Sequence, residues 1–449
     1  MLLRARVVVP VSSPPIDHGA VLVSGRRIHA VGAWREFSRA ARQKAVDLGD
    51  VALLPGLINA HCHLDYTDMA GQFEPPRRFT DWLKLITAEK GQWTDDDFKL
   101  SWGRGARMLE RTGTTTVGDI EALPKLLPEV WDATPLRVFS FLEMTGIRSR
   151  RQPRAVLDEA LEHIAKLKHA RCKAWLSPHA PYSTLPELLK LAARTARRRR
   201  WRMTTHVAES DQEFEMFMHA QGHMHDWLKR NDRNNADCGL GSPVQHLERN
   251  GALTSSLLAI HANYLAPGDA DLLGKHGVHV IHCPRSHAFF RHQAFPFEAL
   301  TATGVNISLA TDSLASVVQP RRKTIVGRAS SLSTAADELG SARFKHGPPD
   351  RQDACPTTLE LNLFEEMRAF ARQFPSVSPE TILQMVTLNP ARALGCAGKL
   401  GELRAGAFAD LIALPVGRRS ENVFESILHH SGHVAASMIN GSWAITPPN

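Results

Sequence analysis

Eight short apolar runs recur along the chain, and each ends on a side chain that can bind a metal ion or move a proton. The first, VALLPGLINA, leads into His61 and His63. Amphipathic segments such as RAVLDEALEHIAKLK lie between the runs, so strands and helices are predicted to alternate. Eight parallel strands that alternate with helices favour a closed α/β barrel, which gathers polar groups at the carboxyl ends of its strands. The later runs end at Asp119, Glu143, His179, His206, His261, His282 and Asp312.

The two ends of the chain carry a different pattern. Residues 1–52 alternate apolar and polar positions between Gly and Asp turns, and residues 397–449 do the same. We therefore predict a (β/α)8 TIM-type barrel over residues 53–396 and one small composite β-sandwich domain built from both termini. A stretch of about 317–358, rich in Ser, Arg, Gly and Pro, follows the eighth strand. It is interpreted as a passive insertion or, alternatively, as a lid or partner surface near the barrel mouth.

Composition restricts the class of protein. Hydrophobic residues make up 43% and charged residues 22%, which is ordinary for a soluble globular chain, and no apolar run reaches the roughly 20 residues of a membrane span. The start, MLLRARVVVPVSSPP, lacks the apolar stretch of a secretory signal, and six scattered cysteines are typical of reduced thiols. We therefore expect a cytoplasmic protein without a membrane partner. The net charge of +8 owes much to an arginine run at 194–200, interpreted as a helix end, so no nucleic-acid partner is expected.

Four of the strand-end residues have the types and order of a mononuclear metal site. His61 and His63 are two residues apart on a strand, so both imidazoles point to the same face. His206 and Asp312, at the fifth and eighth strand ends, would complete a set of three nitrogens and one carboxylate oxygen. Zinc accepts such a set and leaves a position for water, and ferrous iron also tolerates it. The sequence thus predicts one divalent metal, with zinc favoured over iron.

These segments together resemble the amidohydrolase superfamily, in particular the branch that holds methylthioadenosine/S-adenosylhomocysteine deaminases, guanine deaminases and triazine hydrolases. The resemblance is carried by PGLINAHCHLD, SPHAPYST, THVAES, AIHANYL, HCPRSHAFF, LATDSLAS and LNPARALG, which extend over essentially the whole chain. Within the branch, HCHLDYT followed by FTDWL is similar to aminodeoxyfutalosine deaminases. The resemblance implies the barrel with its composite β domain, a small-molecule substrate and a homodimer.

The resemblance also implies roles for single residues. His61, His63, His206 and Asp312 match the metal ligands of the family, and Glu209 matches its acid/base.

His261 matches the residue that orients the attacking water, and His179 matches the substrate-contacting histidine of the deaminase branch. Trp82 follows the first strand's long loop, where relatives place an aromatic ring against the substrate. His287 stands where deaminase relatives usually carry an asparagine, and it is a weaker candidate contact. Two-metal members carry a lysine at the end of the fourth strand; Lys173 lies too early for that, so a single metal is expected.

The reaction that this set predicts is hydrolytic deamination of an aminated N-heterocycle, such as a purine base or a nucleoside-like metabolite. Metal-bound hydroxide would attack the ring carbon, with Asp312 accepting a proton from the water. Glu209 would protonate a ring nitrogen and later pass a proton to the departing ammonia. An alternative is hydrolysis of an amide, a cyclic amide or a ring substituent other than amine. A remote alternative is a non-catalytic barrel that serves as a binding module.

Overall fold

The computed structural model describes residues 1–146, 152–318, 359–417 and 422–448; the predicted insertion at about 317–358 lies almost entirely outside these ranges. Eight parallel strands form one sheet in sequence order. A parallel bridge between Cys62 and Asp312 joins the last strand's end to the first, so the sheet closes into the predicted barrel. The strands are β8 (Leu57–Cys62), β9 (Thr114–Glu121), β10 (Arg137–Met144), β11 (Lys173–Pro178), β12 (Met203–Val207), β13 (Leu257–His261), β14 (His279–His282) and β15 (Asn306–Leu309).

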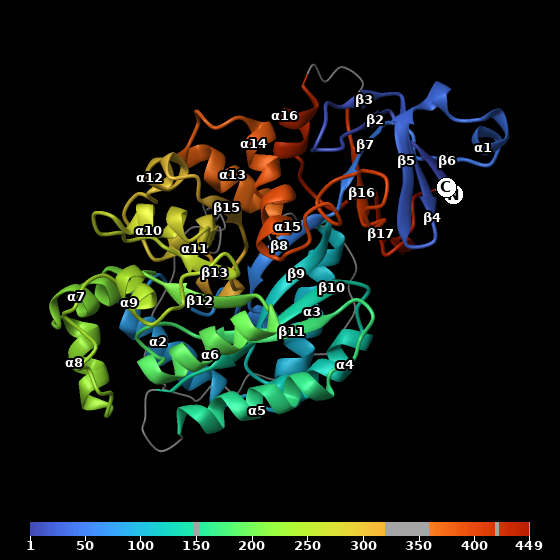
Figure 1. Cartoon of the computed structure of the whole chain (residues 1–449). Coiled ribbons are helices and arrows are strands. Elements are labelled where there is room, and N and C mark those ends of the chain that lie inside the picture. Colours follow the sequence, from blue (N-terminus) through green and yellow to red (C-terminus); the bar gives the residue numbers. More distant parts are fainter. Residues whose placement is uncertain (147–151, 319–358, 418–421, 449) are drawn as a thin grey trace, which may run out of the picture.

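Helices surround the barrel and cover its outer surface (Figure 1). Helix α6 shows why they form: Leu188, Ala192 and Ala196 recur at helical spacing and are buried, while the arginines follow at its C-terminal end. The helices along the barrel are α2 (Phe79–Lys90), α3 (Asp95–Arg111), α4 (Leu127–Asp132), α5 (Pro153–Lys166), α6 (Pro186–Arg199), α7 (Asp211–His219), α8 (His223–Arg230), α9 (Pro243–Arg249), α10 (Asp269–Lys275), α11 (Pro284–Phe289), α12 (Phe297–Ala302), α13 (Leu363–Gln373), α14 (Pro379–Gln384) and α15 (Leu388–Ala393), with 3-10 turns η2 (Leu64–Met69), η3 (Pro124–Leu126) and η4 (Leu314–Ser316).

Both termini contribute strands to a second unit beside the barrel (Figure 1). One sheet has the order β5-β4-β1-β6 and the other the order β18-β17-β16-β7-β2-β3. Leu3 and Val21 of the first sheet and Leu53 and Met438 of the second share one buried cluster, so the two sheets pack as the predicted composite sandwich. The elements of this unit are β1 (Leu2–Arg4), β2 (Val7–Val8), β3 (Ile16–Asp17), β4 (Gly19–Ser24), β5 (Arg27–Ala33), η1 (Trp34–Glu36), α1 (Arg39–Gln43), β6 (Val46–Asp47), β7 (Val51–Pro55), β16 (Leu411–Pro415), α16 (Val423–Leu428), β17 (Ala436–Ile439) and β18 (Ser442–Ile445).

The run VALLPGLINA, which the sequence presents as one strand, is divided at Gly56. Strand β7 pairs antiparallel with β16 in the terminal sheet, and only β8 belongs to the barrel, although the predicted division after residue 52 places most of β7 in the barrel. A Cβ atom on Gly56 would lie 2.1 Å from Oγ1 of Thr115, so the chain passes from one sheet to the other where only glycine fits.

A buried ion pair joins the two units. Arg137 at the start of β10 donates from Nε and Nη2 to the two carboxylate oxygens of Asp410, at 3.2 and 3.4 Å, and its guanidinium lies 4.1 Å from the ring centroid of Phe408. The same carboxylate accepts the backbone N–H of Asn440. The Arg137 and Asp410 side chains are only 6% and 3% exposed, so each charge is stabilised by the other in place of water.

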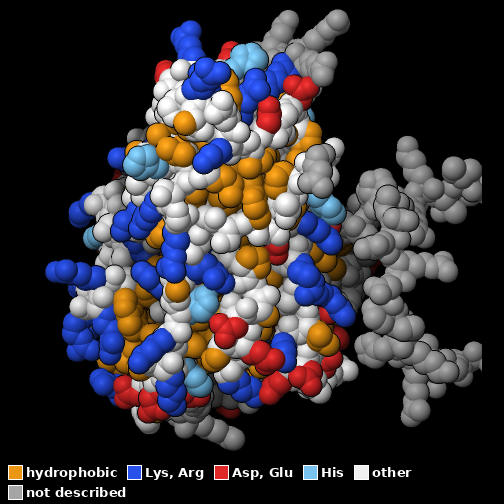
Figure 2. Space-filling view, turned by 90° about the vertical axis from the view of Figure 1, so that its right-hand side faces the viewer, with side chains coloured by type: hydrophobic (Ala, Val, Ile, Leu, Met, Phe, Trp, Pro, Cys, Tyr) orange, Lys and Arg blue, Asp and Glu red, His pale blue; other side chains and the backbone are white. Residues whose placement is uncertain are grey.

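The surface carries the excess positive charge in a dispersed form. On the face shown in Figure 2, Lys and Arg side chains extend from top to bottom, and acidic side chains gather towards the lower edge. Among the described residues, no helix combines the length and the apolar character that crossing a bilayer requires.

Candidate active site

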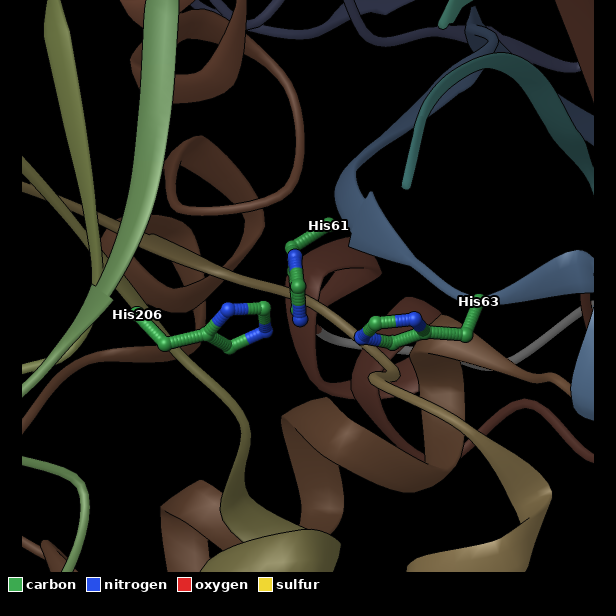
Figure 3. Close-up of side chains that lie close together, drawn as sticks. All are labelled: His61, His63 and His206. Atoms are coloured by element: carbon green, nitrogen blue, oxygen red, sulfur yellow. The ribbon is translucent and has the colours of Figure 1, made fainter. Parts of the chain in front are cut away.

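Three histidines meet at the carboxyl ends of the first and fifth barrel strands (Figure 3). His61 and His63 come from the end of β8 and His206 comes from β12, and their nitrogens lie within 4.8 Å of one another. The side chains are buried, and Nδ1 of His63 and both ring nitrogens of His61 have no hydrogen-bond partner. Burial lowers the pKa of His63 to about 3 and that of His206 well below its ordinary value, so these two imidazoles are neutral and keep their lone pairs for a metal. The group fits a divalent ion by both chemistry and spacing.

Asp312 completes this cluster. Its Oδ1 lies 3.4 Å from Nε2 of His61 and 3.6 Å from Nε2 of His63. Its Oδ2 accepts hydrogen bonds from the hydroxyls of Ser286 at 2.6 Å and Ser316 at 3.1 Å. Although burial raises the pKa of Asp312, the nearby imidazoles of His61, His63 and His261 hold it below its ordinary value. The carboxylate therefore turns one oxygen to the histidines while two serines fix the other.

Glu209 and His261 form the second half of the site. Oε1 of Glu209 lies 3.5 Å from Nε2 of His261, and the His261 ring stacks 5.6 Å from that of His206. Burial, followed by the charges of Asp312 and Glu213, raises the pKa of Glu209 well above its ordinary value. Burial thus favours the protonated form of this carboxyl group, which can act as a general acid.

The backbone at these strand ends is held in a costly conformation. His261 and Asp312 have φ angles of 75° and 54°, in the left-handed region that residues other than glycine seldom adopt. Hydrogen bonds fix the nearby chain: the N–H of Glu209 donates to Oε2 of Glu213 at 2.9 Å, and Nδ2 of Asn263 donates to the Glu209 carbonyl at 2.9 Å. Strained backbone is common at active sites, where it fixes the orientation of catalytic side chains, so these φ angles agree with an active site here.

His179 lies directly beside the metal cluster. Its ring is 4.8 Å from that of His206, and its backbone carbonyl accepts a hydrogen bond from Nδ1 of His206 at 2.8 Å. This bond leaves Nε2 of His206 free for the metal. The Nδ1 of His179 shares a hydrogen bond of 2.6 Å with the Ser183 hydroxyl, and its Nε2 lies 4.0 Å from the Glu143 carboxylate. His179 thus combines support of a metal ligand with a side chain available at the site.

The remaining two predicted contacts lie farther from the histidine cluster. Trp82 packs against Phe79 and Phe290, with ring centroids 5.8 and 5.1 Å away, and its Nε1 is buried without a hydrogen-bond partner. The ring of His287 lies 5.3 Å from that of His282 and 5.4 Å from that of His292, between ring centroids. Burial lowers the pKa of His287 to about 4, so it is neutral at pH 7. The structure gives neither residue a ring contact with the metal-cluster histidines.

Several residues that support the site are absent from the sequence-based prediction. They are Ser286, Ser316, Glu213 and Asn263. Ser286 and Ser316 lie within the quoted segments HCPRSHAFF and LATDSLAS, so their position after strand ends was a usable signal. Asn263 likewise lies within the quoted segment AIHANYL, but it and Glu213 bind backbone groups of residue 209, a contact that no residue pattern predicts.

Known proteins are similar to this chain along most of its length. A family model described as the amidohydrolase family matches residues 52–444. The chain is 28% identical to a 5-methylthioadenosine/S-adenosylhomocysteine deaminase of Syntrophobacter fumaroxidans, over 89% of this chain and 80% of that protein.

Two solved structures share the fold. One is the aminofutalosine deaminase of Helicobacter pylori in complex with methylthio-coformycin, with a TM-score of 0.80 and 20% identity over 99% of this chain and 100% of that one. The other is the atrazine chlorohydrolase of Arthrobacter aurescens with zinc, with a TM-score of 0.78 and 18% identity over 99% and 95% of the two chains.

Proposed function

This chain belongs to the amidohydrolase family, and from that premise we propose that it is a metal-dependent hydrolytic deaminase of an aminated N-heterocycle. The observation that carries the proposal is the arrangement of three buried histidines beside Asp312, with Glu209 3.5 Å from the neighbouring His261. The similarity to a deaminase of adenosine-type nucleosides supports a purine nucleoside as the substrate class.

The metal would be held by His61, His63, His206 and Asp312. When bound, it supplies a water molecule that is easily deprotonated at neutral pH. Zinc is proposed over iron because nitrogen-rich sites with one carboxylate suit it, and the chlorohydrolase that shares the fold holds zinc. Lys173, at the start of β11, lies at the opposite end of the strand from the site, which supports a single ion.

The side chains then divide the proton transfers. Asp312, ionised because of its histidine neighbours, accepts the proton that the attacking water loses. Glu209, whose protonated form burial favours, gives its proton to the ring nitrogen, which makes the adjacent carbon electrophilic. It then takes the second proton of the attacking oxygen and passes it to the departing amine, and the proton held by Asp312 afterwards restores Glu209. His261, beside Glu209, orients the water and donates a hydrogen bond to the oxygen on which charge develops.

Substrate binding is assigned to His179, Trp82 and His287. His179 is close enough to the metal cluster to contact the reacting ring directly. Trp82, with Phe79 and Phe290, offers an aromatic wall against which a planar heterocycle can stack. His287, whose Nε2 is buried without a partner, offers a polar contact at the seventh strand end.

A second candidate function is hydrolysis of a ring substituent other than amine, which the structural similarity to a chlorohydrolase favours. Ammonia release separates the two. Zinc-loaded protein is assayed with adenosine, methylthioadenosine, S-adenosylhomocysteine, aminodeoxyfutalosine, guanine, cytosine and melamine. Release from one of them with kcat/KM of about 10⁴ M⁻¹s⁻¹ or more supports the deaminase. If metal-replete protein releases no ammonia from any compound of this panel, hydrolysis of an amide or of another ring substituent becomes the proposed function.

We also propose a cytoplasmic location and a homodimer. Five cysteines in the described part of the chain are free thiols, which supports a reducing compartment. The homodimer follows from the family resemblance and is tested by light scattering on the purified protein.

A further inference from the structure

A buried arginine lies in the excursion that links the fifth and sixth barrel strands. Arg233 follows α8, which with α7 forms the edge of the molecule beside α9 (Figure 1). Its side chain is 0% exposed. Both nitrogens of its guanidinium fork meet the Asp237 carboxylate, at 2.7 and 2.9 Å. A fully buried guanidinium needs all its donors satisfied, so the partners of the remaining donors matter.

Two of the guanidinium nitrogens, Nε and Nη2, donate to the loop that carries His179, while Nη1 also donates to the Asn234 carbonyl at 3.1 Å and to Oδ1 of Asn235 at 3.2 Å. The Nε of Arg233 donates to the carbonyl of Tyr182 at 2.8 Å, and its Nη2 donates to the carbonyl of Pro181 at 3.1 Å. Asp237 therefore orients a planar fork whose other edge holds two successive carbonyls of the segment SPHAPYST. Lysine could not reproduce this, because an ammonium group lacks the fixed fork geometry.

The same loop touches the site at three points. The His179 carbonyl accepts from the metal ligand His206, and the His179 side chain is aimed by Ser183. The Tyr182 ring meets His179 edge-on at 5.8 Å and Phe79 at 6.4 Å, so it connects the histidine to the aromatic wall around Trp82. Any displacement of the Pro181 and Tyr182 carbonyls is thus passed to the side chains that would face substrate.

We propose that Arg233 is a positioning residue for the reaction: it fixes the His179 loop in its binding geometry through the Pro181 and Tyr182 carbonyls. The inference rests on the proposed function, since it assigns His179 to the substrate. It predicts that the helical excursion after the fifth strand determines substrate affinity without contributing a group that touches the substrate.

The test compares Arg233→Lys with Arg230→Lys, which changes an exposed arginine at the C-terminal end of α8. Arg233→Lys keeps a positive charge beside Asp237 and so preserves folding better than an apolar replacement. Misplacement of a contact group by about 1 Å can cost up to about 10²-fold. We expect kcat/KM to fall by roughly 10- to 100-fold, mostly through KM, with zinc content unchanged. Arg230→Lys should match the wild type.

A double-mutant cycle with His179→Gln separates positioning from general loss of stability. If Arg233 acts through His179, adding Arg233→Lys to His179→Gln should change kcat/KM by less than about twofold. Independent, multiplicative losses would overturn the proposal.

Hydrogen–deuterium exchange supplies a readout that needs no substrate. In Arg233→Lys, exchange should rise in peptides covering residues 178–184 and stay unchanged in peptides covering β13. Unchanged exchange in the loop, or a uniform rise in all peptides, would refute the proposal that Arg233 holds the His179 loop in place. If the wild type releases no ammonia from any nucleoside, the proposed function fails, while the exchange result still decides whether Arg233 holds the loop.

Discussion

Replacing Glu209 with glutamine removes the titratable carboxyl group and changes the shape of the side chain little. Glutamine has nearly the same volume, and the contacts of residue 209 that hold the chain run through its backbone, to Glu213 and Asn263. The variant Glu209→Gln should therefore fold and bind zinc as the wild type does. The site is buried, with Glu209 5% exposed, so bulk water cannot easily take over the proton transfer.

The size of the loss follows from how often the reaction uses this group. One positioned proton transfer is typically worth about 10²–10⁴-fold, and the proposed reaction needs Glu209 for two transfers. We expect kcat to fall by about 10³-fold or more, equivalent to about 4 kcal/mol of barrier.

The assay is ammonia release at matched zinc content, with Glu215→Gln, a change of a half-buried residue of α7, as the control. Turnover above a tenth of the wild-type rate in Glu209→Gln would refute the acid/base assignment. Loss of zinc or of folding in the variant would refute the reasoning that only backbone contacts hold this residue.

Other predictions concern stability, pH and metal. Arg137→Met should cost roughly 3–5 kcal/mol in urea unfolding because it strands the buried Asp410 charge, and Asp410→Asn in the same chain should recover part of it. Burial raises the pKa of Glu213 to about 8 from 4.5. The stability from its protonated form is present below pH 4.5 and is lost as pH rises to about 8, so the unfolding free energy of Glu213→Gln should rise relative to the wild type across that window. Zinc at about 100 times its Kd should stabilise the wild type by about 2.7 kcal/mol, and His206→Asn should abolish most of this thermal shift.

Each of these has a contrary outcome. A loss below about 1 kcal/mol for Arg137→Met would mean that water reaches the pair. If the unfolding free energies of Glu213→Gln and the wild type change in parallel with pH, the carboxyl group of Glu213 is ionised in the folded protein at neutral pH. An undiminished zinc-dependent shift in His206→Asn would remove that histidine from the metal site.

The barrel and the metal cluster could be predicted from the sequence because both follow from period and position. Side chains two apart on a strand share a face, and polar residues at parallel strand ends meet at one rim. These rules place His61, His63, His206 and Asp312 at one rim with the other strand-end residues, and the family resemblance singles them out as ligands. The structure brings the four side chains together.

The features that could not be predicted from the sequence depend on backbone contacts between segments that are distant in the chain. The division of one apolar run between two sheets rests on the close approach of Thr115 to Gly56. The role of Arg233 rests on carbonyls some fifty residues earlier in the chain, to which its spacing in the sequence gives no pointer. Trp82 and His287 are predicted as substrate contacts from resemblance alone.

The central claim is that one water molecule replaces one amine at a metal held by this site. Zinc-loaded protein is incubated with methylthioadenosine, or with the best substrate of the panel, in water enriched in oxygen-18. The account predicts one ammonia per substrate consumed and one oxygen-18 atom in each product molecule, with both lost when zinc is chelated. Substrate consumption without ammonia, or ammonia release without incorporation of the label, would contradict it.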